Sequence, residues 1–142
     1  WSSSIIWKKD SLVISRKDYH TQYEPIWYGW NEDETRLSPL LDRKQSDVWE
    51  VSRPKASKLH PTTKPIELVE RAINNSSQRT NLILDLFLGS GSTLIASEKT
   101  GRKCYGMELD PKYADVIVER WQNYTGKDAI LESNNEKYND LT

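Results

Sequence analysis

The spacing of apolar residues changes along the chain from strand-like to helix-like. In residues 1–30, three β-like runs rich in β-branched and aromatic residues, SSSIIWKK, SLVIS and YEPIWYGW, are separated by polar breaks, which predicts a strand meander. From Asn31 to Lys64 the chain is polar and charged, with one β-like island at DVWEV. We expect this stretch to be an irregular excursion with little core of its own.

The pattern after the excursion alternates helices and strands. Pro65 suits a first helical position, and apolar residues recur at helical spacing from Ile66 until NNSS stops the run. The run NLILDLF predicts a strand, which leads through a glycine turn into a helix from about Ser92 to just before Gly101.

A second strand and a last helix complete the pattern. RKCYGMEL predicts the strand, and the helix that follows can be capped by Asp110, started by Pro111 and ended by Gly126. Its shared apolar face would comprise Tyr113, Val116, Ile117, Trp121 and Tyr124. This order predicts a right-handed βαβ unit preceded by a packing helix, hence an α/β fold with a mainly parallel sheet.

Composition limits the class of protein. With 142 residues, 36% of them hydrophobic, the chain suits one domain with a modest core, and a net charge of −1 means that any contact with nucleic acid needs a local basic patch. The single cysteine, Cys104, and two histidines separated by forty residues predict neither a disulfide nor a metal cluster, and a reducing, cytoplasmic location fits best. We expect no membrane span or leader, and the start at Trp1 inside a strand-like run predicts a piece of a longer protein.

The glycine turn LFLGSGS is a candidate ligand site. Its two glycines let backbone approach a ligand, and the following helix offers unpaired N–H groups. A nucleoside triphosphate would require a lysine after Gly91, which is absent, and a dinucleotide would favour a third glycine where Leu94 stands. S-adenosylmethionine carries no phosphate and needs less glycine.

Two acidic residues discriminate between the remaining ligands. Asp85 ends the first strand, where its carboxylate could accept from the ammonium group of S-adenosylmethionine. Glu108, seventeen residues after Gly91, could take both ribose hydroxyls, and Leu109 could cover the adenine. A dinucleotide would place its pyrophosphate near Asp85, so the pair favours S-adenosylmethionine. The alternatives are that the turn serves packing alone, that Asp85 caps the helix and that Glu108 is a solvated strand end.

Three motifs in series, HPTTKP (60–65), DLFLGSGS (85–92) and GMELDPKY (106–113), resemble the C-terminal half of bacterial and phage DNA amino-methyltransferases of the N6-adenine/N4-cytosine type, in the β-class order. KDYHTQYEPIWYGW and DVWEVSRP are similar to the phage and ParB-associated adenine-specific members. The resemblance covers essentially the whole chain. It implies an incomplete Rossmann-like S-adenosylmethionine-dependent methyltransferase fold and an adenine-specific enzyme of the kind found in restriction-modification systems.

The resemblance also implies roles for individual residues. The family's F-x-G-x-G motif falls on Phe87, Gly89 and Gly91, and Thr62 and Lys64 would help to hold the methionine carboxylate. Together with the spacing argument, the expected cofactor-binding residues are Thr62, Lys64, Asp85, Phe87, Gly89, Gly91, Ser92, Glu108 and Leu109. They lie in residues 60–142, which we expect to be the cofactor-binding part.

One family motif is absent from the sequence. Members carry [DNS]-P-P-[YFW], which holds the target amino group, but no P-P dipeptide occurs here, and DPKY at 110–113 is interpreted as a helix cap. The catalytic motif would then precede Trp1, so we expect no catalytic residue in this chain, little activity alone, and the missing N-terminal half as a partner, with a homodimer as a further option. N4-cytosine modification, a nicotinamide-dependent oxidoreductase and a non-enzymatic DNA-binding module are the rival functions.

The excursion over 31–59 corresponds to the target-recognition segment of the resembling family. The expected contacts with double-stranded DNA are Arg36, Arg43, Lys44, Arg53, Lys55 and Lys58, with acidic residues among them. Six tryptophans would suit a stacking platform, but core packing is the predicted role for most of them.

Overall fold

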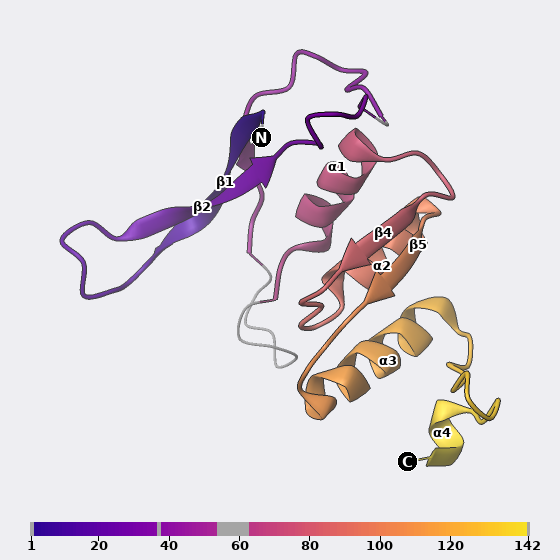
Figure 1. The fold of residues 1–142 in the computed structure, drawn as a ribbon. Helices are drawn as coiled ribbons and strands as arrows, with labels where there is room; N and C mark the ends of the chain where they lie inside the picture. Colours follow the sequence, from indigo (N-terminus) through magenta and orange to yellow (C-terminus); the bar gives the residue numbers. More distant parts are fainter. Residues whose placement is uncertain (1, 37, 54–62, 142) are drawn as a thin grey trace.

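The computed structural model describes residues 2–36, 38–53 and 63–141. Strands β1 (Ser3–Val13) and β2 (Thr21–Tyr28) form an antiparallel hairpin, and β3 (Val48–Glu50) pairs in parallel with the other edge of β1, so the order is β2-β1-β3. Figure 1 shows this sheet beside helix α1 (Ile66–Ser76). The predicted meander is therefore wrong in detail, because SSSIIWKK and SLVIS belong to one long strand and the third strand comes from the excursion.

Two tryptophans form the centre of the core between this sheet and α1. Trp7 and Trp49 face each other across β1 and β3 and are 2% and 3% exposed, and they cluster with Val51 and with Leu68 of α1. The Trp7 indole N–H donates to the Val51 carbonyl at 2.7 Å. The expectation that the excursion has little core is wrong, since it supplies Trp49 and Val51.

The other tryptophans divide between core and surface. Trp121 is half-buried on the last long helix, whereas Trp27 is 79% and Trp30 is 43% exposed. The predicted core role therefore holds for Trp7 and Trp49 but not for the pair in and after β2. Trp27 sits on the strand face that α1 does not cover, since Ile26 and Tyr28 alternate with it toward the helix side.

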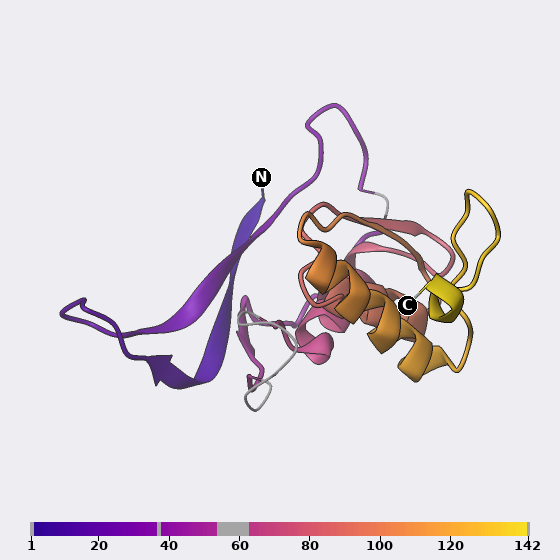
Figure 2. The same cartoon turned by 90° about the horizontal axis from the view of Figure 1, so that it is seen from below.

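The second half is the predicted βαβ unit. Strands β4 (Leu82–Asp85) and β5 (Lys103–Gly106) pair in parallel, joined by helix α2 (Ser92–Thr100), which packs against α1. Helix α3 (Pro111–Thr125) follows and lies alongside α2 (Figure 2). Three end signals are confirmed: the Asp110 carboxylate accepts from the Lys112 N–H at 3.0 Å, and Gly101 and Gly126 cap their helices in the left-handed region.

The C-terminal tail adds little regular structure. The apolar run DAILE forms only an isolated bridge between Ile130 and Lys137, before a short helix α4 (Tyr138–Leu141). None of the helices in the described ranges has the length and apolar character to cross a membrane.

Trp7→Phe should lower the free energy of unfolding by about 1–3 kcal/mol, because the buried Val51 carbonyl loses its donor. Urea denaturation followed by circular dichroism measures this change. Trp27→Phe is the matched control and should change stability by less than about 0.5 kcal/mol, since that side chain lies in solvent. Equal effects of the two substitutions would contradict the assignment of Trp7 to the core.

Candidate functional site

The carboxyl ends of β4 and β5 lie side by side and carry the two loops of the candidate site. Past the paired strands the loops remain hydrogen bonded: Met107 N–H donates to the Asp85 carbonyl and Leu88 N–H donates to the Met107 carbonyl, both at 2.9 Å. In open α/β sheets, ligands bind outside this end of the strands.

Gly91 occupies the tightest position of the turn. It is the N-cap of α2 with φ +78°, and a Cβ there would lie 3.2 Å from the Ile117 Cγ2 of α3. A side chain would therefore meet both backbone strain and a packed neighbour. The glycine allows the turn to pass directly against α3.

Arg120, one turn after Ile117 on α3, is hydrogen bonded to the same turn. Its Nη1 donates to the Ser90 carbonyl at 2.8 Å, with longer contacts to the Ser90 and Ser92 hydroxyls at 3.3 and 3.4 Å. Burial lowers the pKa of this guanidinium. Sequence reasoning missed Arg120, although its place between Ile117 and Trp121 on the apolar side of the helix was a signal that it points inward.

The Glu108 carboxylate joins the two loops. One oxygen accepts from the Gly89 N–H at 2.7 Å and the other accepts from the Asp110 N–H at 3.0 Å. A carboxylate oxygen can accept more than one hydrogen bond. Glu108 thus shapes the glycine turn as well as being a candidate ligand-binding group.

A cavity of about 320 Å³ lies over the glycine turn, within the range of small-molecule sites. Its lining residues are Lys64, Asp85, Phe87, Leu88, Gly89, Ser90, Ser92, Thr93 and Glu108. Asp85, whose carboxylate accepts from the Phe87 N–H at 3.0 Å, and Glu108 both line this space. The cavity can therefore offer acceptors to a cation and to hydroxyl groups.

Lys64 connects this cavity to the hairpin sheet. Its carbonyl accepts from the Ser92 hydroxyl at 2.8 Å, and its ammonium lies 3.0 Å from the carboxylate of Glu24 on β2. Lys9, which is 9% exposed, contacts the same carboxylate at 2.7 Å. Burial alone would raise the pKa of Glu24, but the hydrogen bonds from Lys9 and Lys64 outweigh it and the pKa lies below its ordinary value. Neither Lys9 nor Glu24 was expected from the sequence.

Most of the expected cofactor residues meet at this cavity, although their roles stay predictions. Those that line it are Lys64, Asp85, Phe87, Gly89, Ser92 and Glu108. Gly91 lies behind them at the helix start, and Leu109 is 98% exposed and does not line the cavity. Thr62 lies outside the described residues.

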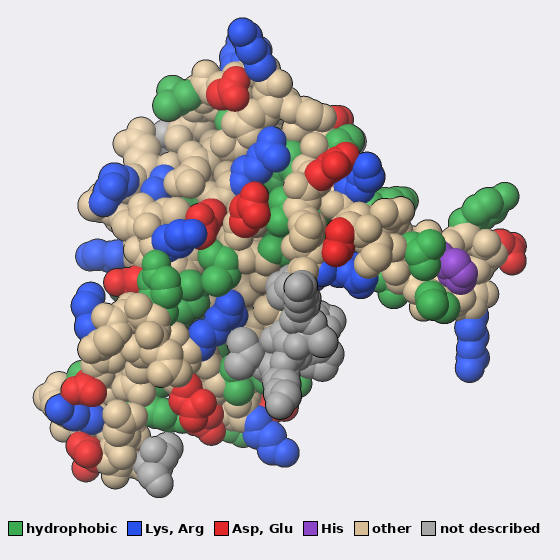
Figure 3. All heavy atoms as spheres, turned by 180° about the vertical axis from the view of Figure 1, so that it is seen from behind, with side chains coloured by type: hydrophobic (Ala, Val, Ile, Leu, Met, Phe, Trp, Pro, Cys, Tyr) green, Lys and Arg blue, Asp and Glu red, His purple; other side chains and the backbone are tan. Residues whose placement is uncertain are grey.

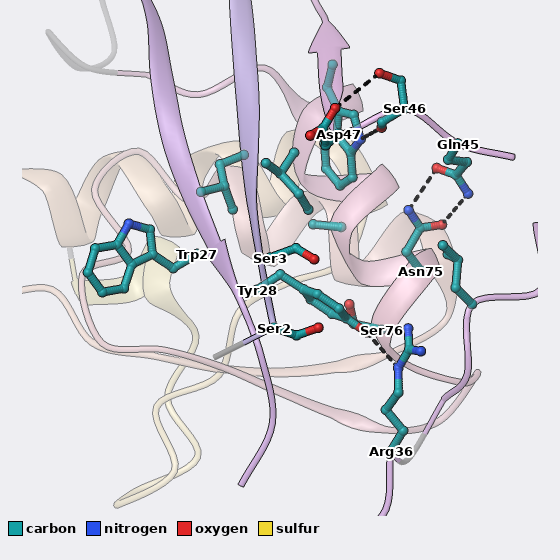
Figure 4. A pocket seen from close by; sticks show the side chains of 15 residues that line it. Ser2, Ser3, Trp27, Tyr28, Arg36, Gln45, Ser46, Asp47, Asn75 and Ser76 are labelled. Carbon is teal, nitrogen blue, oxygen red and sulfur yellow. Dashed lines mark hydrogen bonds between the residues drawn. The ribbon is translucent and has the colours of Figure 1, made fainter. Parts of the chain in front are cut away.

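The expected DNA-contact residues are dispersed. Arg36 donates to the Tyr28 hydroxyl at 2.9 Å and lies over the Trp30 ring. Arg36 and Tyr28 line a second cavity of about 340 Å³ between the hairpin sheet and α1 (Figure 4). Arg53 instead contacts Asp10 and Ser11, near the far end of β1. Arg43 and Lys44 are exposed, whereas Lys55 and Lys58 lie outside the described residues. In the described ranges no cluster of three or more metal-binding side chains occurs.

Comparison with known proteins decides the family. A sequence profile described as DNA methylase, of the N6/N4 type, matches residues 2–119. The chain belongs to the N6/N4 DNA methylase family. The chain is 28% identical over 135 residues to the Type II methyltransferase M2.MboI of Moraxella bovis, covering 85% of this chain and 50% of that protein. The methylase chain spans about half the length of the curated relatives it matches.

Solved structures share the fold. The complex of M1.HpyAVI with S-adenosylmethionine superimposes with a TM-score of 0.68 at 24% identity, over 84% of this chain and 61% of that one. TTHA0409 from Thermus thermophilus, complexed with S-adenosyl-L-methionine, gives a TM-score of 0.58 at 27% identity, over 85% and 52%. The α/β methyltransferase fold expected from the sequence is thereby confirmed, as a partial copy.

Gly91→Ala should destabilise the methylase chain more than Gly126→Ala. Both glycines have positive φ, which costs an alanine about 1–2 kcal/mol, but only the alanine at 91 would also meet Ile117, whereas nothing lies within 4 Å at 126. Chemical denaturation of both variants measures the difference. Ile117→Val should recover part of the loss in Gly91→Ala, and equal losses at the two glycines would contradict the close approach.

Lowering the pH should weaken the contacts of the Glu24 carboxylate with Lys9 and Lys64, which join the hairpin sheet to the cavity. Because the pKa of Glu24 is lowered in the folded chain, its contribution to stability is present above the unfolded value near 4.5 and is lost as pH falls below it. Thermal unfolding from pH 7 to pH 3 measures this loss. In Glu24→Gln the melting temperature should fall less between pH 7 and pH 3 than in the parent chain. An unchanged pH dependence would show that the Lys9 and Lys64 contacts contribute nothing to stability.

Proposed function

We propose that this chain is the cofactor-binding portion of a DNA amino-methyltransferase that binds S-adenosylmethionine for transfer of a methyl group to the N6 of adenine in DNA. The observation that carries the proposal is the convergence of the Asp85 and Glu108 carboxylates on one cavity at the glycine turn. A dinucleotide could also use Glu108 for its ribose but would bring its pyrophosphate near Asp85, whereas S-adenosylmethionine offers an ammonium to Asp85 and ribose hydroxyls to Glu108.

The residues around the cavity fit the parts of this cofactor. Asp85 would accept from the ammonium, Glu108 from the ribose hydroxyls, and Lys64 with Thr62 would face the carboxylate. Phe87 and Leu109, which are 89% and 98% exposed beside the turn, would cover the adenine. The bound cofactor supplies the methyl group, and the chain's own residues bind and orient it.

Adenine is the proposed target because KDYHTQYEPIWYGW and DVWEVSRP resemble adenine-specific members of the family. N4 of cytosine is the second candidate, since the matching family covers both. A target amino group inside a duplex must be extruded before it can reach a methyl donor. The proposed setting is bacterial or phage DNA modification in the cytoplasm, with residues 31–59 as the DNA-contact segment.

A second part of the enzyme is proposed to complete this one. On the strands of the parallel pair, Leu82, Leu84 and Tyr105 are 54%, 63% and 65% exposed, although parallel sheets are normally covered on both faces. The matched relatives are about twice as long. We therefore favour an upstream half, which would also carry the [DNS]-P-P-[YFW] motif, as the cover for this face, over a second copy of this chain.

Calorimetric titration of S-adenosylmethionine into the 142-residue chain tests the proposal. Asp85→Ala and Glu108→Ala should each weaken binding about tenfold or more, because each removes a charged hydrogen-bond acceptor. Glu132→Ala, an exposed acid outside the cavity, is the control and should bind normally. Preference for NADH, or no binding by a chain shown to be folded, would contradict the proposal.

A second assay, transfer of a radiolabelled methyl group from S-adenosylmethionine to DNA, tests activity separately from cofactor binding. The 142 residues alone should transfer little or none to duplex DNA, since no P-P motif is present. Turnover by this chain would show that the target amino group is held by other residues.

A further inference from the structure

The β1–β2 hairpin continues beyond the core as a projecting arm. Figures 1 and 2 show its distal half standing clear of the helices, and the regular register of the hairpin is interrupted between Lys8 and Val13. Its turn, residues 14–20 (ISRKDYH), is the arm tip. Because the residues of the arm tip do not pack in the core, core packing does not explain which residues occur there.

The arm tip presents large apolar side chains to solvent. Ile14 is 83% and Tyr19 is 90% exposed, and Leu12 and Val13 beside them are 47% and 38% exposed. An exposed hairpin end is normally blunted with polar residues, and a grouped apolar exposure indicates a binding surface. Figure 3 shows hydrophobic side chains together with Lys or Arg, acidic and histidine side chains at the end of the arm.

The arm tip also has a defined turn. The Ser15 N–H donates to the His20 Nδ1 at 3.2 Å, and the Lys17 N–H donates to the Ser15 hydroxyl at 3.3 Å. Arg16 and Lys17 project from this turn, against the single acid Asp18. Neither cation forms an ion pair with another residue of the described ranges. A polyanion is thus the partner that the exposed charges favour.

The arm tip is connected to the candidate cofactor cavity through one strand. β2 runs from the tip to Glu24, whose carboxylate contacts Lys64 at the cavity. Tyr19 lies five positions before Glu24, and because the strand begins only at Thr21, about 16 Å is the upper limit of their separation. This length equals about five base pairs along a duplex. DNA that presents a base to the cavity would therefore pass within reach of the tip.

We propose that the arm tip is a DNA wedge, in which Arg16 and Lys17 contact phosphates while Ile14 and Tyr19 insert between bases near the extruded target. The inference rests on the proposed function, since it requires DNA at the cavity. Apolar side chains inserted at a base step unstack it and bend the duplex, at a cost of a few kcal/mol that wider protein contact offsets. Here the unstacking would also assist extrusion of the neighbouring base.

A duplex with one central, mispaired 2-aminopurine tests the wedge on the 142-residue chain, because a mispaired base is the easiest to extrude. The double variant Arg16→Gln/Lys17→Gln should lower the slope of log affinity against log salt by about 1.8, or about 0.9 per lost phosphate contact. Ile14→Ser/Tyr19→Ser should leave that slope unchanged but abolish most of the rise in 2-aminopurine fluorescence on binding. Anisotropy of a labelled duplex measures the affinity.

Matched controls lie outside the arm. Leu41→Ser removes an apolar side chain that is 99% exposed, and Lys127→Gln removes an exposed cation; neither should change the fluorescence or the salt slope. No duplex binding at 50 mM salt, or binding that the arm-tip variants leave unaltered, would overturn the wedge. So would sedimentation showing a dimer that Ile14→Ser/Tyr19→Ser dissociates, since the tip would then be an interface between copies.

Calorimetry with S-adenosylmethionine on the same variants distinguishes the two proposals. The arm-tip variants should bind the cofactor like the parent chain. Normal cofactor binding with no effect of the tip on DNA would overturn the wedge alone, whereas absence of cofactor binding in the parent would overturn the proposed function on which it rests.

Discussion

The Glu108 carboxylate is the contact on which the candidate site depends. By accepting from Gly89 N–H and from Asp110 N–H, it fixes the glycine turn after β4 to the start of α3. Arg120 of α3 adds a further contact to the glycine turn, because its guanidinium donates to the Ser90 carbonyl. The same carboxylate fixes the loops and would contact a ligand. A substitution of Glu108 would therefore change the shape of the site as well as remove a ligand contact. The shape of the glycine turn is therefore fixed by two side chains, of which Glu108 also lines the cavity.

A second polar junction ties the two sheets together. Glu24 lies between Lys9, which is nearly buried, and Lys64, which is exposed. Its carboxylate therefore links β1, β2 and the segment leading into α1. Only Lys9 is nearly buried, so removal of the Glu24 carboxylate would leave the Lys9 ammonium without its ion-pair partner, whereas removal of Lys64 would leave the Lys9–Glu24 pair intact. The two ion pairs join the hairpin to Lys64, which lines the cavity. A partner bound at the arm tip would act on the same β2 strand that orients Lys64.

What the sequence predicted well is local in the chain. The caps at Asp110 and Gly126 and the unit β4-α2-β5 follow from residues within one or two turns of each other, so their signals are complete in a short window. The failures are contacts across long separations. The sequence pattern places Lys8 near the end of a first short strand, yet it pairs with Glu50 of β3, forty-two residues away, and the strand continues through it. Nothing within a window around Lys8 identifies that partner.

The candidate site shows the same division between local and distant information. Asp85, Gly91 and Glu108 were predicted from the strand ends and the glycine turn, which are visible within a short stretch of sequence, and Asp85 and Glu108 line the cavity. Arg120 and Glu24 were missed because each contacts a cavity residue at least thirty positions away. Phe87 was assigned from the family motif and Leu109 from its place beside Glu108, and both side chains are exposed to solvent. Apolar side chains so exposed need a cover, and a bound adenine or a neighbouring segment of the enzyme would each supply one. The described polar residues of the cavity thus come from this chain, whereas Phe87 and Leu109 are apolar side chains that a ligand or a further segment would have to cover.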